Sequence, residues 1–155
     1  MQENVPMLDA VIENIVRKGN PVYKTVYFYG EPDAVIEVLD NLEGAYRAAH
    51  PRKRLIRSSG GVFARWAYDA MAHSGRVDPV FLAEDCDFLI FRDIEQLGGK
   101  EFCMELIYWV LDYCLEHNIQ LVVTGSVPVK DLICLEDRIR AQLAGCLCCS
   151  VDAGE

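Results

Sequence analysis

The sequence TVYFYGEPDAVIEVLDNLEGAYRAA, at residues 25–49, decides the fold of this chain. Its first five residues form a continuous β-prone run that ends at Gly30, which is typical of a strand buried on both faces. From Val35 onwards, apolar residues recur three and four positions apart, which predicts a helix with one buried face. A buried strand followed by an amphipathic helix is the repeating unit of a parallel α/β sheet.

The same alternation continues on both sides of this stretch. Apolar residues at helical spacing predict further helices, the first of them stopping at Gly19 and the second capped by Ser59. These helices are expected within residues 1–20, after Ser59, over 100–117 and over about 135–143. Further strands are expected at residues 54–57, 87–91, 119–123 and 146–151. We therefore predict one α/β domain over residues 1–155, with a core at 25–151, in which helices cover both faces of a five-stranded parallel sheet.

Composition and charge narrow the class of protein. The chain has 155 residues, of which 52% are hydrophobic and 25% charged, so a folded domain is expected rather than a disordered one. No apolar run approaches the ~18–20 residues that span a bilayer, and no secretory signal is visible, so we expect a cytoplasmic protein without a membrane partner. Fifteen basic against 24 acidic residues give a net charge of −9, which disfavours direct nucleic-acid binding. The short basic run at residues 52–54 is expected to lead into a strand.

Seven cysteines lie mostly among apolar residues, where a reduced thiol behaves as a small hydrophobic group. Cys146 and Cys149 form one C-x-x-C spacing, but a structural zinc site usually needs a second pair of ligands. We therefore predict no metal site and a Cys-rich final strand. A metal or redox protein that uses Cys146 and Cys149 stays an alternative.

The turn after the first strand is where a parallel α/β sheet usually holds its ligand. A phosphate-binding loop there would read G-x-x-x-x-G-K-[ST], with backbone amides around the phosphates. Gly30 matches the first glycine, whereas Val35, Ile36 and Glu37 replace the second glycine, the lysine and the hydroxyl residue. The carboxylates of Glu31 and Asp33 would repel a polyanion bound here, and Pro32 has no amide N–H to donate to it.

Three segments resemble, in order, the AAA+ core of the bacterial replication initiator DnaA and its relative Hda. They read YFYG at residues 27–30, DFLIFRDIEQLGGKE at 87–101 and LVVTGSVPVKDLICLEDR at 121–138. The resemblance spans residues 25–151 and implies a P-loop NTPase-like sheet, here without the family's helical lid or helix-turn-helix domain. It also implies a role in replication initiation or its regulation, through a protein partner such as an active AAA+ initiator or through self-association.

Departures from the family's pattern argue against catalysis. Where the family has two acids that organise Mg²⁺ and polarise water, this sequence has Arg92 and Asp93. Gln142 stands in the string where the family places an arginine finger, and Thr124 and Ser126 occupy the polar sensor region without an assignable role. The expectation is therefore a pseudo-ATPase without catalytic residues or cofactor. The alternative is weak ATP or ADP binding, with Mg²⁺, by an atypical loop.

Two further hypotheses concern side chains and partners. Glu37 and Arg92 replace two groups that would share one Mg²⁺, so an ion pair between them could fill the metal position. The competing interpretation is that Arg92 points to solvent or pairs with Asp93. The apolar helix at residues 100–117 is one candidate partner surface, although burial against the sheet is the simpler expectation. A direct DNA-binding factor is a third class of function, which the charge of −9 disfavours.

Overall fold

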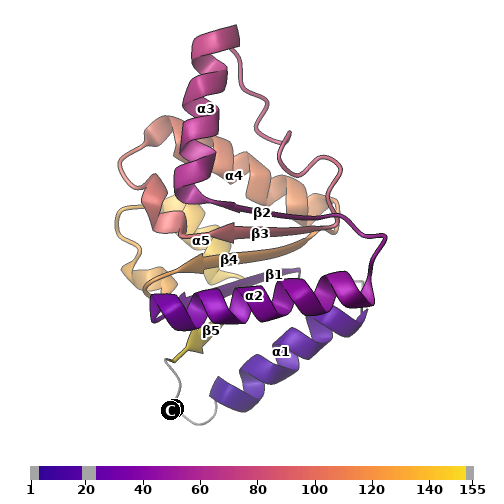
Figure 1. The fold of residues 1–155 in the computed structure, drawn as a ribbon. Helices are drawn as coiled ribbons and strands as arrows, with labels where there is room; N and C mark the ends of the chain where they lie inside the picture. The colour runs from indigo at the N-terminus through magenta and orange to yellow at the C-terminus, as the bar shows by residue number, and fades with distance from the viewer. Residues whose placement is uncertain (1–3, 19–23, 153–155) are drawn as a thin grey trace.

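A five-stranded, all-parallel sheet organises the computed structural model, which describes residues 4–18 and 24–152 (Figure 1). The strand order is β2-β3-β4-β1-β5, so the first strand in the sequence lies between the last two. The predicted α/β fold and the five strands are confirmed. The strands are β1 (Thr25–Gly30), β2 (Leu55–Ser59), β3 (Phe88–Arg92), β4 (Gln120–Gly125) and β5 (Leu147–Val151).

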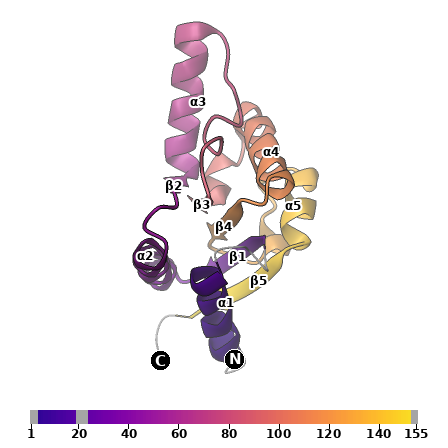
Figure 2. The ribbon, with the colours of Figure 1, turned by 90° about the vertical axis from the view of Figure 1, so that its right-hand side faces the viewer.

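Helices cover both faces of the sheet, as predicted. One hydrophobic cluster packs α1 and α2 against one face, and a second packs α3, α4 and α5 against the other (Figures 1 and 2). The helices are α1 (Asn4–Lys18), α2 (Pro32–Ala49), α3 (Gly60–Ser74), α4 (Glu101–Glu116) and α5 (Asp137–Ala144). Two short 3₁₀ helices, η1 (Ile94–Leu97) and η2 (Val129–Asp131), follow β3 and β4. The predicted stop at Gly19 lies outside the described residues.

The edge strand β2 leads directly into a protruding helix. Arg52 and Lys53 lie in a turn just before β2, which confirms that the basic run leads into a strand. β2 runs two residues further than predicted because Ser58 and Ser59 pair with the end of β3. The Ser59 hydroxyl then caps α3 by accepting a hydrogen bond from the Val62 amide at 3.2 Å, as predicted. Beyond this cap, α3 rises past the edge of the sheet (Figures 1 and 2).

Helix α4 is strongly apolar in sequence because most of its side chains pack in the core. Seven of its side chains are buried, while Glu101, Glu105 and Glu116 lie on its exposed side. Burial as the main role of this helix is thus confirmed, although Trp109 remains 45% exposed and Leu115 40% exposed. No helix in the described part of the chain combines the length and apolar character needed to cross a bilayer.

Candidate functional site

The carboxyl ends of β1, β3 and β4 meet at a small cavity beside the start of α2. Its volume is about 190 Å³. In an open α/β sheet this edge is the usual ligand crevice, so we call this cavity the crevice. Seven of the predicted site residues line it, together with two that the sequence did not single out, Glu95 and Gly125. The seven are Gly30, Pro32, Val35, Ile36, Arg92, Asp93 and Ser126.

The connection from β1 into α2 is a single residue, Glu31. Helix α2 begins at Pro32, so the residues that would arch around a phosphate already form its first turn. The Glu31 carboxylate accepts a hydrogen bond from the Ala34 amide at 2.9 Å, and the Glu31 carbonyl accepts one from the Val35 amide at 3.0 Å. Pro32 has no N–H to donate. Among the described residues, the Asp33 amide is therefore the one N–H in the first turn of α2 that has no acceptor.

Close backbone packing at Gly30 fixes the rim of the crevice. Gly30 has φ +144°, and a Cβ atom placed there would lie 2.0 Å from the carbonyl oxygen of Val151, its partner residue in β5. A side chain is therefore excluded by backbone atoms rather than by a movable side chain. Glycine is therefore required at position 30 for a structural reason that does not depend on phosphate binding.

The predicted ion pair between Glu37 and Arg92 is wrong. An Arg92 guanidinium nitrogen lies 3.2 Å from a carboxylate oxygen of Asp93, and the ion pairs of the described residues include none between Arg92 and Glu37. Asp93 adopts a left-handed backbone (φ 58°) directly after Arg92, whereas Glu37 lies exposed on α2. Both partners of the observed pair are about one-third exposed, so it contributes only about 0–1 kcal/mol.

Thr124 has a structural role that the sequence left unassigned. Its side chain is buried at the end of β4, and its hydroxyl oxygen accepts a hydrogen bond from the Asp93 amide at 3.1 Å. This bond holds the left-handed turn that begins η1. Thr124 thus supports the crevice from behind and is not among its lining residues.

Substituting Thr124→Val keeps the shape of the side chain but removes this acceptor. We expect a loss of about 1–3 kcal/mol in the free energy of unfolding, because the Asp93 amide is left without its partner. Urea denaturation measures the loss, and hydrogen exchange at the Asp93 amide localises it. A Thr124→Ser variant, which retains the hydroxyl, serves as the control for the hydrogen bond. Equal protection of this amide in the valine variant and the parent chain would show that the bond is unimportant.

Glu95 is a crevice residue that sequence reasoning missed. Helix η1 brings its carboxylate over the end of β4, so that a Cβ atom on Gly125 would lie 3.1 Å from Glu95 Oε1 and 2.2 Å from the Tyr27 hydroxyl. Burial, reinforced by the Glu95 charge, raises the pKa of Tyr27 well above its usual value. Tyr27 therefore stays protonated and donates a 2.7 Å hydrogen bond to the Val127 carbonyl. In the sequence, the one indication of this role was the acidic residue within Ile94–Leu97.

Gln142 lies away from the crevice. Its side chain lines a separate cavity with Lys24, Thr25 and Leu115, and its buried Oε1 has no hydrogen-bond partner among the described residues. Because β5 and β1 are parallel, Lys24 and Thr25 mark the amino ends of the strands, opposite the crevice. Within this chain, Gln142 contributes nothing to the crevice.

The C-x-x-C pair is split by the sheet. Cys149 packs with α1 and α2, whereas Cys146 packs with the cluster on the opposite face. Because the two side chains pack with clusters on opposite faces of the sheet, Cys146 and Cys149 do not form a common metal site. Among the described residues, no three His, Cys, Asp or Glu side chains gather in a way that could hold a metal ion.

Cysteine reactivity offers a simple test of the packing. Burial raises the pKa of the Cys86 thiol to about 11 and those of Cys114 and Cys146 to about 12, whereas Cys134 is exposed. We expect iodoacetamide at about pH 8 to modify Cys134 first, because the thiolate is the reactive form and access is required. Mass spectrometry of the intact chain should show one rapid addition, which Cys134→Ser removes. Rapid addition at Cys114 would contradict the packing.

Comparison with known proteins identifies the family of the chain. The family described as the bacterial DnaA ATPase domain matches residues 7–150. The chain belongs to this family. The chromosomal replication initiator DnaA of Porphyromonas gingivalis is 27% identical over 107 residues, which are 68% of this chain and 22% of that protein. The chain thus spans less than a quarter of the length of this curated relative.

Solved structures confirm the DnaA-type AAA+ fold. A replication initiator DnaA bound to AMPPCP and single-stranded DNA superimposes with a TM-score of 0.86 at 16% identity, covering 98% of this chain and 47% of that one. A DnaC helicase loader gives a TM-score of 0.71 at 15% identity, covering 97% and 89% respectively. This DnaA-family domain therefore shares its fold with a protein named as a replication initiator and with one named as a helicase loader.

Proposed function

We propose that this DnaA-family domain does not hydrolyse ATP and acts through protein contacts in or near replication initiation or its regulation. The observation that carries the proposal is the junction between β1 and α2. The Glu31 carboxylate already accepts a hydrogen bond from the Ala34 amide at the start of α2. A bound phosphate would need the amide donors at this same helix end. The domain's own anion thus competes with any ligand anion for the end of this helix.

The charges around the crevice also oppose a nucleotide. Ile36 stands where a phosphate-binding loop has its lysine. The hydrogen bond from that lysine to a phosphate would contribute about 1.5–3 kcal/mol, and it is lost here. Asp33 and Glu37 are exposed on the first turns of α2. Each carboxylate within about 4 Å of a phosphate would cost up to about 4 kcal/mol before screening by solvent. Affinity for a triphosphate should therefore be low.

The residues present do not fit Mg²⁺ either. Arg92 occupies the position of a metal-organising acid, and its guanidinium is paired with Asp93. Glu37 is exposed and replaces the hydroxyl residue of the phosphate-loop pattern. Asp93 and Glu95 are the two carboxylates that line the crevice, and no third His, Cys, Asp or Glu gathers with them among the described residues, so we assign no metal-dependent step to this site.

A protein partner is the remaining role that the fold supports. The net charge of −9 disfavours a nucleic-acid backbone, and the exposed Trp109 and Leu115 on α4 offer apolar contact area. Family membership suggests an active AAA+ initiator or a second copy of this chain as the partner. Analytical ultracentrifugation with the DnaA of the same organism should show a complex that Trp109→Ala weakens and Phe81→Ala does not. Separate sedimentation of both proteins, with no dimer of this chain, would contradict the proposed mode.

Thermal melting distinguishes this proposal from weak ATP or ADP binding. A ligand at 100 times its dissociation constant adds about 2.7 kcal/mol, which raises the Tm of a domain of this size by about 5–10 °C. We expect no such rise with ATP or ADP in the presence of Mg²⁺. A saturable rise would favour the nucleotide-binding alternative.

A further inference from the structure

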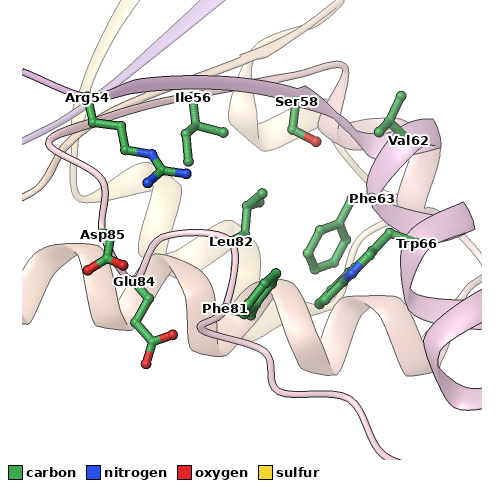
Figure 3. Close-up of a pocket in the computed structure, with 10 residues that line it drawn as sticks. All are labelled: Arg54, Ile56, Ser58, Val62, Phe63, Trp66, Phe81, Leu82, Glu84 and Asp85. Atoms are coloured by element: carbon green, nitrogen blue, oxygen red, sulfur yellow. The ribbon is translucent and has the colours of Figure 1, made fainter. Parts of the chain in front are cut away.

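A third cavity, of about 340 Å³, lies at the open edge of the sheet and shares no lining residue with the crevice. We call it the edge cavity. The edge strand β2, the first turns of α3 and the segment at residues 81–85 enclose it (Figure 3). Its size falls at the lower end of the range for small-molecule sites, about 300–1,000 Å³.

Aromatic rings form one end of the edge cavity. The Trp66 ring lies 5.5 Å from the Phe63 ring and 6.3 Å from the Phe81 ring, and its plane is nearly parallel to that of Phe81 (11°). Phe81 and the neighbouring Val62 are each 63% exposed. A large apolar group placed here would cover surface that the folded chain leaves in contact with water.

Charged side chains of both signs form the other end. Arg54 directly precedes β2, and its side chain extends toward the segment that carries Glu84 and Asp85 (Figure 3). None of these three takes part in an ion pair within 4.0 Å among the described residues. A guanidinium and two carboxylates therefore remain available at the same end of an apolar cavity.

We propose that the edge cavity binds a small zwitterion with a large apolar side chain, of the class of the aromatic or branched α-amino acids. Arg54 would bind the ligand's carboxylate in the forked geometry that guanidinium groups favour, and Glu84 or Asp85 its ammonium group. The ligand's side chain would lie among Phe63, Trp66 and Phe81. Charge complementarity at one end and apolar complementarity at the other favour this class, because a ligand with a single charge can bind only one of the two kinds of charged group.

The length of the site agrees with a ligand of this class. Arg54, just before β2, and Ser58, near the end of β2, line opposite ends of the cavity and are four residues apart, or about 13 Å at the rise of a strand. The Arg54 side chain takes up part of that length. The site is independent of the crevice and of its nucleotide chemistry.

Titration of the ¹⁵N-labelled chain with L-phenylalanine and L-tryptophan, followed by amide shifts of residues 54–66 and 81–85, tests the proposal. Phenethylamine and 3-phenylpropionate each retain the ring and only one charge. We expect saturable shifts with at least one amino acid, and binding at least tenfold weaker for both analogues. Arg54→Gln and Phe81→Ala should each weaken binding at least tenfold. Arg52→Gln and Ile133→Ala, which make matched changes outside the cavity, should not.

Two results would overturn the proposal. One is the absence of saturable shifts with either amino acid up to about 10 mM, a concentration above the dissociation constant of weak metabolite sites. The other is binding that is equally strong for the singly charged analogues or in Arg54→Gln. Both outcomes leave the proposed function standing, because that proposal rests on the crevice and on the exposed face of α4, neither of which lines the edge cavity.

Discussion

Substituting Gly30→Ala is expected to lower the free energy of unfolding by about 2–4 kcal/mol, from backbone strain and overpacking together. The new Cβ atom would lie 2.0 Å from the Val151 carbonyl oxygen, and the φ of +144° is one that L-residues rarely adopt. Relief requires β1 and β5 to separate at the rim of the crevice. Urea denaturation gives the change in stability, and loss of amide protection at Val151 would locate it.

Gly44→Ala is the matched control for this substitution. Gly44 lies inside α2, and no atom lies within 4 Å of the position its Cβ would take. Alanine there should stabilise the chain by about 0.5–1 kcal/mol, because glycine is the poorer helix former. The two substitutions add the same methyl group and should have opposite signs. A Gly30→Ala variant as stable as the parent would refute the close approach of β1 and β5.

Phe28→Ala is expected to cost about 3–5 kcal/mol. Phe28 is fully buried on the inner strand β1, where it pairs with Thr124 of β4 on one side and Cys149 of β5 on the other. Its ring belongs to the cluster beneath α1 and α2, so truncation leaves a cavity between the sheet and two helices. The midpoint of urea unfolding should fall without a change in slope, since the same surface is exposed on unfolding.

The control for this prediction is Phe81→Ala, the same chemical change at a side chain that is 63% exposed. We expect a loss of at most about 1.5 kcal/mol, because the ring is mostly exposed and the contact it loses is its stacking on Trp66. Comparable losses for the two variants would mean that Phe28 is not the core residue described here.

The order of elements was readable from the sequence because burial imposes a clear periodicity. The run at residues 25–29 was typical of a strand buried on both faces and matches β1, and the helical spacing that follows matches α2. The sequence did not show where α2 begins. Treating residues 30–37 as a phosphate loop hid the capping role of Glu31, since a helix start depends on one local hydrogen bond.

Side-chain pairing between distant elements was less predictable. Glu37 and Arg92 were matched by analogy of position, but an exposed arginine takes the carboxylate that its backbone brings nearest, which is that of Asp93. Glu95 enters the crevice through the fold of η1, a turn that leaves no periodic trace in the sequence. The edge cavity joins three separate segments and was therefore invisible before the fold was known.

We propose that the Glu31 carboxylate, which accepts the hydrogen bond of the Ala34 amide, helps to keep a nucleotide phosphate out of the crevice. Amide chemical shifts of the ¹⁵N-labelled chain, recorded during titration with Mg·ATP, test it at residue resolution. We predict no saturable shifts at the crevice amides of Glu31, Asp33, Ala34, Gly125 and Ser126 up to about 5 mM ATP, because several kcal/mol of repulsion and lost contacts weaken binding by about 10³ or more. Saturable shifts confined to these amides would contradict the account.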